Sequence, residues 1–146
     1  MRALVREILD QYAKRALVTI GAHEMLFVAA QRMCDEKVHS LIVEDRPGRP
    51  FIGIFTEHDF VRAVAERKGN VAAVQVFSYM TKDLATCTSD TLIADVKRLM
   101  MQRRIRHVPV IDSDKIVAVI SIGDVTHFQA TLAEVHQDLV DERMRI

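Results

Sequence analysis

GIFTEHDFV at residues 53–61 and AVISIGDVT at residues 118–126 share one skeleton: an apolar run, a hydroxyl residue, and an aspartate three positions later. The apolar run predicts a strand. A hydroxyl residue followed by an acid at this spacing is typical of a helix N-terminus, where the two side chains cap backbone N–H groups. Each stretch therefore predicts a strand that leads directly into a helix. The pairs Thr56/Asp59 and Ser121/Asp124 either only cap these helices or also hold a ligand.

The two stretches belong to a longer internal repeat. Residues 18–45 align with residues 85–112 at a constant offset of 67. Beyond these segments the offset falls to 65, which pairs Thr56 with Ser121. The loss of two residues in a turn explains the change, so the chain contains two copies of one unit.

Within each copy, the pattern predicts the order β-α-β-β-α. Apolar residues recur at helical spacing over residues 25–33 and 92–100, and two short β-branched runs follow each segment. Ser89 or Asp90 is expected to cap the second of these helices.

One copy of about 60 residues would not readily build its own core. We therefore expect an α/β (α+β) fold in which two β-α-β-β-α units pack about a pseudo-twofold axis, with helices added at both ends of the chain. The expected division places residues 1–70 with the N-terminal helix in one repeat and residues 71–146 in the other.

The composition excludes several classes of protein. The 146 residues are 49% hydrophobic, and 20 basic residues balance 20 acidic ones, so no net charge favours nucleic acid or an anionic membrane. The N-terminal segment lacks the apolar core of a signal peptide, and no later run approaches a membrane span. We expect a cytoplasmic protein whose two cysteines, Cys34 and Cys87, are reduced.

The last segment of the chain carries an apolar stripe at helical spacing. Its members are Val125, Phe128, Leu132, Val135 and Leu139. Two partners could pack on this stripe: the apolar face of an N-terminal helix at residues 4–9, or a second copy of the chain in a homodimer.

These features resemble the CBS-domain tandem pair, also called a Bateman module. The resemblance is carried by RHVPVID at residues 106–112, by its partner VHSLIVED at residues 38–45, by Thr19 and Thr86, and by the closing GIFTEHD and AVISIGD. It covers nearly the whole chain, and the strings FTEHDFVRAV, YMTKDLATC and VISIGDV look like stand-alone bacterial CBS-pair proteins.

The resemblance implies a regulatory module that binds AMP, ADP or ATP, or else NAD(H) or S-adenosylmethionine, in clefts between the repeats. It also favours a homodimer. A protein target, which the sequence does not identify, is expected as well, and no metal is expected.

The repeated motif suits a ribonucleotide. A strand that ends at a helix N-terminus presents backbone N–H groups to which a phosphate can bind. The hydroxyl of Thr56 or Ser121 can donate to a phosphate oxygen, and the carboxylate of Asp59 or Asp124 can accept from both ribose hydroxyls. Helix capping explains the same spacing at least as well.

An adenine ring needs flat apolar walls and a few backbone hydrogen bonds. The candidate walls, each of which is individually more typical of a core residue, are Ile20, Leu41 and Ile54 in the first copy and Cys87, Val108, Pro109 and Ile120 in the second. Carried over from the family by position, Thr19 and Thr86 border the two cavities.

The copies differ in ways that predict unequal occupancy. His58 stands where similar proteins often have arginine, so phosphate affinity is predicted to rise as pH falls. Ala118 replaces the glycine that Gly53 supplies in the first copy, which narrows the approach of the backbone.

A cationic run precedes the central strand of the second copy. Arg106 is the leading candidate to clamp a phosphate, with His107 beside it. Arg103 and Arg104 are explained equally well as cations that complement a helix C-terminus.

No catalytic motif is complete. His23 and Glu24 begin like a zinc-binding HExxH motif, but the fifth residue is Phe27. The histidines show no metal-ligand spacing, and no phosphate-binding glycine-rich loop is present. We expect a non-catalytic sensor of adenine ribonucleotides; the alternative is a scaffolding protein whose clefts stay empty and whose helical faces serve assembly.

Overall fold

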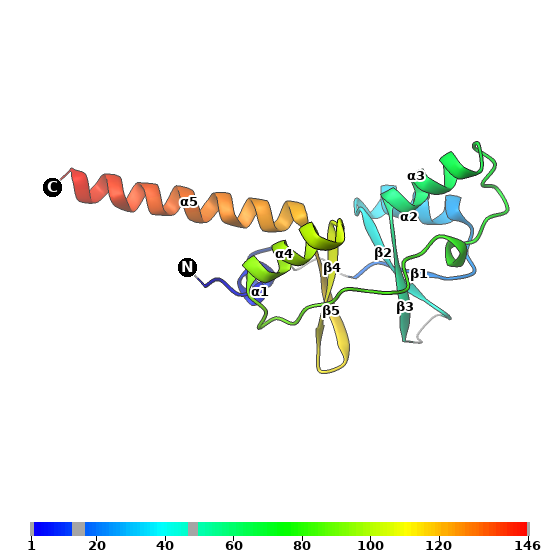
Figure 1. Cartoon of the computed structure of the whole chain (residues 1–146), viewed down its shortest axis with the longest axis horizontal. Helices are drawn as coiled ribbons and strands as arrows, with labels where there is room; N and C mark the ends of the chain where they lie inside the picture. The colour runs from blue at the N-terminus through cyan, green and yellow to red at the C-terminus, as the bar shows by residue number, and fades with distance from the viewer. Residues whose placement is uncertain (1, 13–16, 47–49, 146) are drawn as a thin grey trace. The chain divides into compact units, whose positions relative to one another are not determined.

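The computed structural model describes residues 2–12, 17–46 and 50–145 (Figure 1). The chain forms two compact units, and each is described by itself. The first-repeat unit comprises residues 17–84, and the second-repeat unit combines residues 85–146 with residues 1–16. The expected division grouped the N-terminal helix with the first repeat, whereas the structure groups it with the second.

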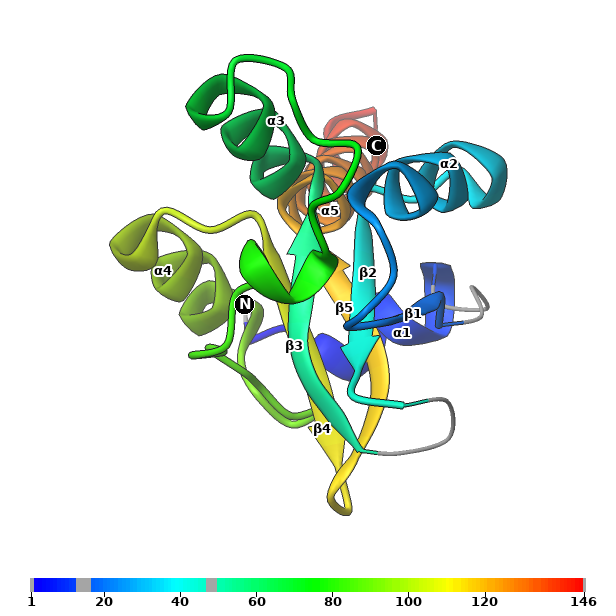
Figure 2. The same ribbon diagram turned by 90° about the vertical axis from the view of Figure 1, so that its right-hand side faces the viewer.

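The first-repeat unit has the predicted order β-α-β-β-α. Its elements are β1 (Thr19–Gly21), α2 (Leu26–Glu36), β2 (Ser40–Glu44), β3 (Phe51–Thr56), α3 (Glu57–Glu66) and a short 3-10 helix (Val76–Ser78). The sheet order is β1-β2-β3, in which β1 and β2 are parallel and β2 and β3 are antiparallel (Figure 2).

The core of this unit lies between one face of the sheet and the two helices. Because side chains alternate along a strand, Leu41, Val43 and Phe55 share the face that packs on the helices. They meet the buried residues Leu26, Ala29 and Met33 of α2 and Ala63 of α3. Among the described residues of this unit, no helix packs on the other sheet face.

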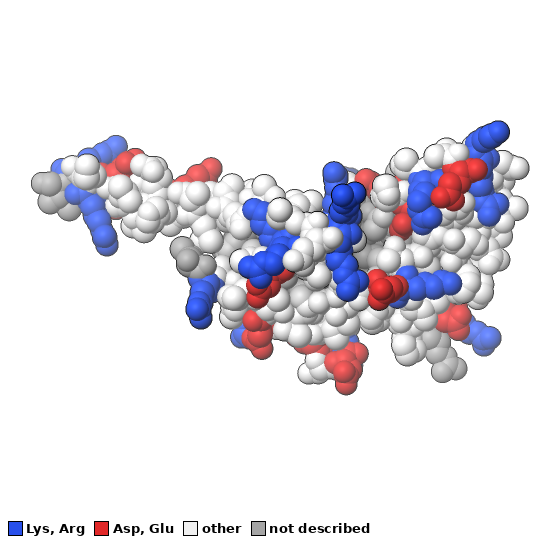
Figure 3. All heavy atoms as spheres, viewed as in Figure 1, with Lys and Arg blue, Asp and Glu red and all other residues white. Residues whose placement is uncertain are grey.

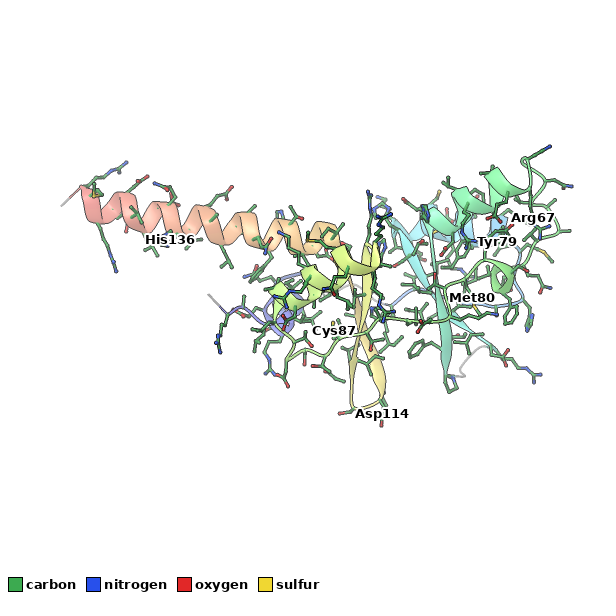
Figure 4. The ribbon with its side chains drawn as sticks, viewed as in Figure 1. Arg67, Tyr79, Met80, Cys87, Asp114 and His136 are labelled. Atoms are coloured by element: carbon green, nitrogen blue, oxygen red, sulfur yellow. The ribbon has the colours of Figure 1, made fainter. Side chains whose placement is uncertain are left out.

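The second-repeat unit contains a shorter sheet. Its elements are α1 (Val5–Tyr12), α4 (Ile93–Arg103), β4 (His107–Asp112), β5 (Lys115–Ser121) and α5 (Ile122–Met144). Strands β4 and β5 form an antiparallel hairpin, with Asp114 at its tip (Figure 4).

The expected opening strand of the second copy is reduced to one parallel bridge between Cys87 and Val110. Two features shorten it. In the first copy the N–H of Ala22 donates to the backbone carbonyl of Glu44 at 2.8 Å, whereas the equivalent N–H of Ser89 donates to the Asp112 carboxylate at 3.1 Å. At the other end, the N–H of Ile42 donates to the carbonyl of Val18 at 3.0 Å, whereas its equivalent in the second copy is Pro109, which has no N–H.

The N-terminal segment caps α4 with backbone groups. The N–H of Ile93 donates to the carbonyl of Ala3 at 2.9 Å, and α4 has no side-chain cap. The prediction that Ser89 or Asp90 caps this helix is therefore wrong. Asp90 instead forms an ion pair with Arg6.

Helix α5 is covered only over its first half. Val125 and Phe128 are buried in the core that also contains Val5 and Ile8, which confirms packing of α5 against the N-terminal helix. Beyond Leu132 the helix extends past α1 and α4, and residues 133–145 are all exposed (Figure 1).

The surface is mixed in charge. Figure 3 shows Lys and Arg side chains interspersed with Asp and Glu side chains on the visible face of each unit. Among residues 2–12, 17–46 and 50–145, no helix has the length and apolar character needed to cross a membrane.

Candidate functional site

Both copies of the repeated motif form reciprocal helix caps. At the start of α3, the N–H of Thr56 donates to Asp59 Oδ2 at 2.9 Å, and the N–H of Asp59 donates to Thr56 Oγ1 at 3.4 Å. At the start of α5, the N–H of Ser121 donates to Asp124 Oδ2 at 2.9 Å, and the N–H of Asp124 donates to Ser121 Oγ at 3.1 Å. The capping role is thus confirmed twice. The ligand role stays a prediction.

The Asp59 carboxylate is held at an energetic cost. Its side chain is 7% exposed, and its Oδ1 lies 3.6 Å from a guanidinium nitrogen of Arg62. Burial raises the pKa of Asp59, although hydrogen bonds from Thr56 and the charge of Arg62 act in the opposite direction. A buried acid with a raised pKa is typical of functional sites as well as of structural networks.

The strand register shows which candidate residues share a face. In the first-repeat unit, Ile42 pairs with Ile54 across β2 and β3, and Thr19 is the partner of Ile42 across β1 and β2. Side-chain alternation places Thr19, Ile54 and Thr56 on the sheet face opposite α2 and α3. Ile42 joins them there, and its equivalence to Pro109 in the repeat alignment was the signal that could have identified it.

The second-repeat unit repeats this arrangement. His107 pairs with Ser121, and Pro109 pairs with Val119. Alternation therefore places these four residues on the sheet face opposite the helix-packed core. Val119, the counterpart of Ile54, was not among the predicted residues.

Most of the predicted adenine walls are core residues of their own unit. Ile20, Leu41, Cys87, Val108 and Ile120 all belong to the two helix-packed cores. The simpler alternative, that these side chains serve packing, is therefore confirmed. Their contact with adenine stays a prediction, whereas Ile54 and Pro109 lie on the opposite faces.

The two threonines at the openings differ in exposure. Thr19 is partly buried, and its carbonyl accepts a hydrogen bond from Arg32 at 2.7 Å. Thr86 is exposed and precedes the single bridge at Cys87.

The helix N-termini carry different charges in the two copies. The N–H of Glu57 donates to the carbonyl of His39 at 3.2 Å, and the N–H of Ile122 donates to the carbonyl of Arg106 at 2.8 Å. His39 and Arg106 thus occupy equivalent positions. In the first copy, His39 Nδ1 lies 2.5 Å from Glu57 Oε1. The second copy has Ile122 in place of this glutamate and Arg106 in place of this histidine.

No single motif identifies this pair, but the repeat offset of 67 aligns His39 with Arg106, which is the signal in the sequence that points to it. His58, the next residue of α3, is exposed, as is Arg106. The second copy therefore offers the more favourable charge to a phosphate group.

The other cations serve the end of α4. Arg103 lies in its last turn, where a cation complements the helix dipole. Arg104 is the C-cap residue in the left-handed conformation, with φ of 53°. This confirms the helix-terminus alternative for the position of both residues.

Gly53 is required by packing. A Cβ at this position would lie 2.7 Å from the Thr81 carbonyl oxygen and 3.1 Å from Met80 Sδ, and Met80 lies beside β3 (Figure 4). Ala118, its counterpart, is buried in the core of the second-repeat unit. Gly53 is therefore explained by close backbone approach within the first-repeat unit. The alanine at the equivalent position, Ala118, gives no information about ligand access in the second copy.

Two observations concern thiol reactivity and metal binding. Burial raises the pKa of Cys87 to about 11, so its thiolate is scarce at neutral pH. No group of three His, Cys, Asp or Glu side chains within the described part of the chain is placed to hold a metal ion.

Solved structures share this fold. The CBS-domain containing protein ATU1752 from Agrobacterium tumefaciens is 31% identical, with a TM-score of 0.81 over 87% of this chain and 93% of that one. The hexameric CBS-CP12 protein from bloom-forming cyanobacteria is 30% identical, with a TM-score of 0.73 over 85% of this chain and 69% of that one. The CBS domain pair of protein MJ0100, solved with 5′-methylthioadenosine and S-adenosyl-L-methionine, is 22% identical with a TM-score of 0.76 over 90% of this chain and 98% of that one, a likeness of fold.

Sequence relatives point the same way. An uncharacterized 17.7 kDa protein of Acidianus ambivalens is 32% identical over 87% of this chain and 74% of its own length. The mitochondrial CBS domain-containing protein CBSX3 of Arabidopsis thaliana is 32% identical over 70% of this chain, which spans about half (51%) of that relative. The family model for the CBS domain matches residues 5–66 and again residues 75–141. The chain therefore belongs to the CBS-domain family and carries two CBS repeats.

Proposed function

We propose that this CBS pair is a non-catalytic sensor that binds an adenine ribonucleotide in clefts between its two repeats. AMP, ADP and ATP are the leading ligands, with NAD(H) and S-adenosylmethionine as further members of the same chemical class. The sensor would act in the cytoplasm and report its occupancy to a protein target.

The observation that carries this proposal is the duplicated strand-to-helix junction. Each copy brings a hydroxyl residue and an aspartate to a helix N-terminus, on a sheet face that no helix of its own unit covers. At the first junction, Asp59 Oδ2 caps the helix, and Asp59 Oδ1 lies 3.6 Å from a guanidinium nitrogen of Arg62. A carboxylate oxygen can accept more than one hydrogen bond, so Oδ1 suits a ribose diol as a further partner.

The proposed division of roles follows the chemistry of each group. Phosphate would bind at the starts of α3 and α5, to backbone N–H groups that the capping bonds do not use, such as those of His58 and Gly123, and to the hydroxyls of Thr56 and Ser121. The Thr56 hydroxyl, which donates to Asp59 Oδ2 at 3.2 Å, would exchange that acceptor for the phosphate. Asp59 and Asp124 would receive the ribose hydroxyls. Arg106 would clamp a phosphate at the second site.

The MJ0100 pair supports the class of ligand, since that protein was solved with two adenosine compounds.

Signalling requires a difference in affinity. A ligand that binds two arrangements of the repeats equally shifts nothing, whereas one that prefers a single arrangement populates it. We propose that the bound nucleotide selects one arrangement of the two repeats and that the partner protein recognises it.

We further propose that the protein acts as a homodimer. The uncovered half of α5 supports this, since large apolar residues there reach 53% exposure at Val135 and 54% at Leu139. The hexameric assembly of the CBS-CP12 protein shows that one relative of this fold forms an oligomer.

A thermal-shift panel of AMP, ADP, ATP, NADH and S-adenosylmethionine tests the proposal. A ligand at a hundred times its dissociation constant adds about 2.7 kcal/mol to stability, which is readily measured as a rise in melting temperature. A flat response to all five compounds would favour the scaffolding alternative.

A further inference from the structure

Arg62 connects the Asp59 carboxylate to an aromatic side chain of the same unit. It lies one helical turn after Asp59 on α3, with a guanidinium nitrogen 3.6 Å from Asp59 Oδ1. The two side chains differ in burial, since that of Asp59 is 7% exposed and that of Arg62 is 43% exposed. An ion pair at this spacing on a helix surface usually contributes little. The other contacts of the guanidinium therefore decide whether it can hold the carboxylate in place.

Three such contacts fix the position of the Arg62 guanidinium. It donates to the backbone carbonyl of Tyr79 at 3.2 Å, and its central carbon lies 5.1 Å from the centre of the Tyr79 ring. A second guanidinium nitrogen lies 3.7 Å from Glu66 Oε1. A cation over an aromatic ring is attracted to the electron-rich face. Groups other than Asp59 thus set where this cation lies, and the carboxylate meets a cation that is already in position.

Tyr79 is itself held firmly. It is buried in the core of the first-repeat unit, its hydroxyl donates to Glu66 Oε2 at 3.0 Å, and the same hydroxyl accepts from Arg67 Nε at 3.2 Å. The guanidinium of Arg67 also lies over the ring, 5.6 Å from its centre (Figure 4). Arg62 and Arg67 therefore share the Tyr79 ring, whereas the ion pair with Asp59 comes from Arg62.

The second copy has a different residue at this position. The repeat offset of 65 aligns Arg62 with His127, three residues after Asp124. Arginine is charged at every pH of interest, whereas histidine changes its charge near neutrality. The permanent cation beside the aspartate is therefore a feature of the first copy.

We propose that Arg62 is a positioning residue of the first candidate site, where it holds the Asp59 carboxylate in the orientation that receives the ribose hydroxyls. The inference rests on the proposed ribose role of Asp59. Because Asp59 Oδ2 accepts the Thr56 N–H at 2.9 Å, Oδ1 is the oxygen that Arg62 orients and that would accept a ribose hydroxyl. Arg62 itself touches no part of the ligand in this arrangement.

Arg62 also sets the pH range in which the first site can bind. Burial raises the pKa of Asp59, and the charge of Arg62 acts in the opposite direction. A protonated carboxyl group offers fewer acceptor positions to a ribose. Removal of the Arg62 charge should therefore move the loss of affinity on acidification to higher pH. The other titratable groups of this junction are His58 and the pair of His39 and Glu57, and all three are retained in the variants below.

The test is calorimetric titration of the full chain with AMP, ADP, ATP, NADH and S-adenosylmethionine, all of which contain an adenosine ribose diol. With the tightest of them, Arg62→Met should bind at least about threefold more weakly at neutral pH. Across about pH 4.5 to 7.5, its affinity should begin to fall at a higher pH than that of wild type. Arg62→Lys keeps the charge and should restore the wild-type pH profile. The methionine retains an apolar side chain on the Tyr79 ring, and circular dichroism should show an unchanged fold.

A double-mutant cycle separates this role from a structural one. If Arg62 acts through Asp59, Arg62→Met should change neither the affinity nor the pH profile further in an Asp59→Asn chain. The matched control is Arg67→Met, which removes the other cation from the Tyr79 ring and should bind like wild type. An equal loss of affinity in Arg67→Met would overturn the inference, as would an effect of Arg62→Met that persists in the Asp59→Asn chain.

Failure of this inference and failure of the proposed function give different results. If wild type binds none of the five compounds, both are overturned. If Asp59→Asn weakens binding but Arg62→Met leaves it unchanged at every pH, the positioning role alone is overturned and the ribose role of Asp59 stands.

Discussion

Asp59→Asn separates the capping role of this residue from the proposed ribose role. In the protein, Asp59 Oδ2 accepts the Thr56 N–H at 2.9 Å. An asparagine keeps one oxygen for this bond, so the cap survives. Its second group becomes an NH₂ donor, which cannot accept a ribose hydroxyl. The same argument applies to Asp124→Asn in the second copy.

The expected change in ligand affinity is larger than the expected change in the free energy of unfolding. A hydrogen bond to a charged group contributes about 1.5–3 kcal/mol, so the variant at an occupied site should bind roughly 10- to 150-fold more weakly. The free energy of unfolding should change by less than about 1 kcal/mol because the cap is retained. Asp59→Ala removes both interactions and should lose about 1 kcal/mol or more of stability as well as the ligand.

The pH dependence of stability offers an internal control. Burial raises the pKa of Asp59 above its ordinary value of 3.8, so the folded state holds this proton more tightly than the unfolded state. The free energy of unfolding contributed by Asp59 therefore falls as pH rises from below 3.8 through the folded-state pKa. Asp59→Asn should lack this contribution to the pH dependence.

Calorimetric titration gives the affinities, and urea denaturation followed by circular dichroism gives the stabilities. Wild-type affinity in both Asp59→Asn and Asp124→Asn would refute the ribose role and leave only helix capping. A loss of affinity matched by an equal loss of stability in the free protein would also refute the separation of roles.

Three further predictions concern individual side chains. At pH 8 the thiol of the exposed Cys34 should react rapidly with a disulfide reagent. Cys87 should react only after denaturation, because burial raises its pKa to about 11, and two rapidly reacting thiols per chain would contradict this. Gly53→Ala should lower the free energy of unfolding by about 1–3 kcal/mol in urea titrations, as overpacking does, because the added Cβ would lie 2.7 Å from the Thr81 carbonyl oxygen. An unchanged free energy of unfolding would contradict this and show that β3 can shift. Glu57→Gln should strengthen ATP binding up to about fivefold, as expected for an exposed charge, while adenosine binding stays unchanged; equal effects on both compounds would contradict a phosphate-specific role.

The sequence predicted the fold well because the repeat doubles every signal. The alternating runs of β2 to β5 and the helical spacing of α2 and α4 each occur twice, so each copy supports the interpretation of the other. The mixed α/β (α+β) class and both capping boxes are confirmed.

The differences came mainly from contacts between residues that are far apart in the sequence. The cap of α4 is the carbonyl of Ala3, about 90 residues away along the chain, which no local pattern around Ser89 or Asp90 announces. The second opening strand is shortened at one end by a side-chain acceptor, Asp112, that only the fold brings close. At the other end it is shortened by Pro109, which has no N–H to donate.

The candidate site was predicted less completely, for a related reason. A one-residue step along a strand moves a side chain to the opposite face. Leu41 and Val108 therefore joined the cores, while their neighbours Ile42 and Pro109 share faces with the repeated hydroxyl residues. Spacing within one strand does not say which face a helix covers.

The most direct test of the central claim is calorimetric titration of the intact chain with whichever of AMP, ADP, ATP, NADH or S-adenosylmethionine gives the largest thermal shift. The proposed sensor predicts saturable binding of one or two molecules per chain, weakened by Asp59→Asn, Asp124→Asn or both. The absence of saturable binding by all five compounds would contradict it.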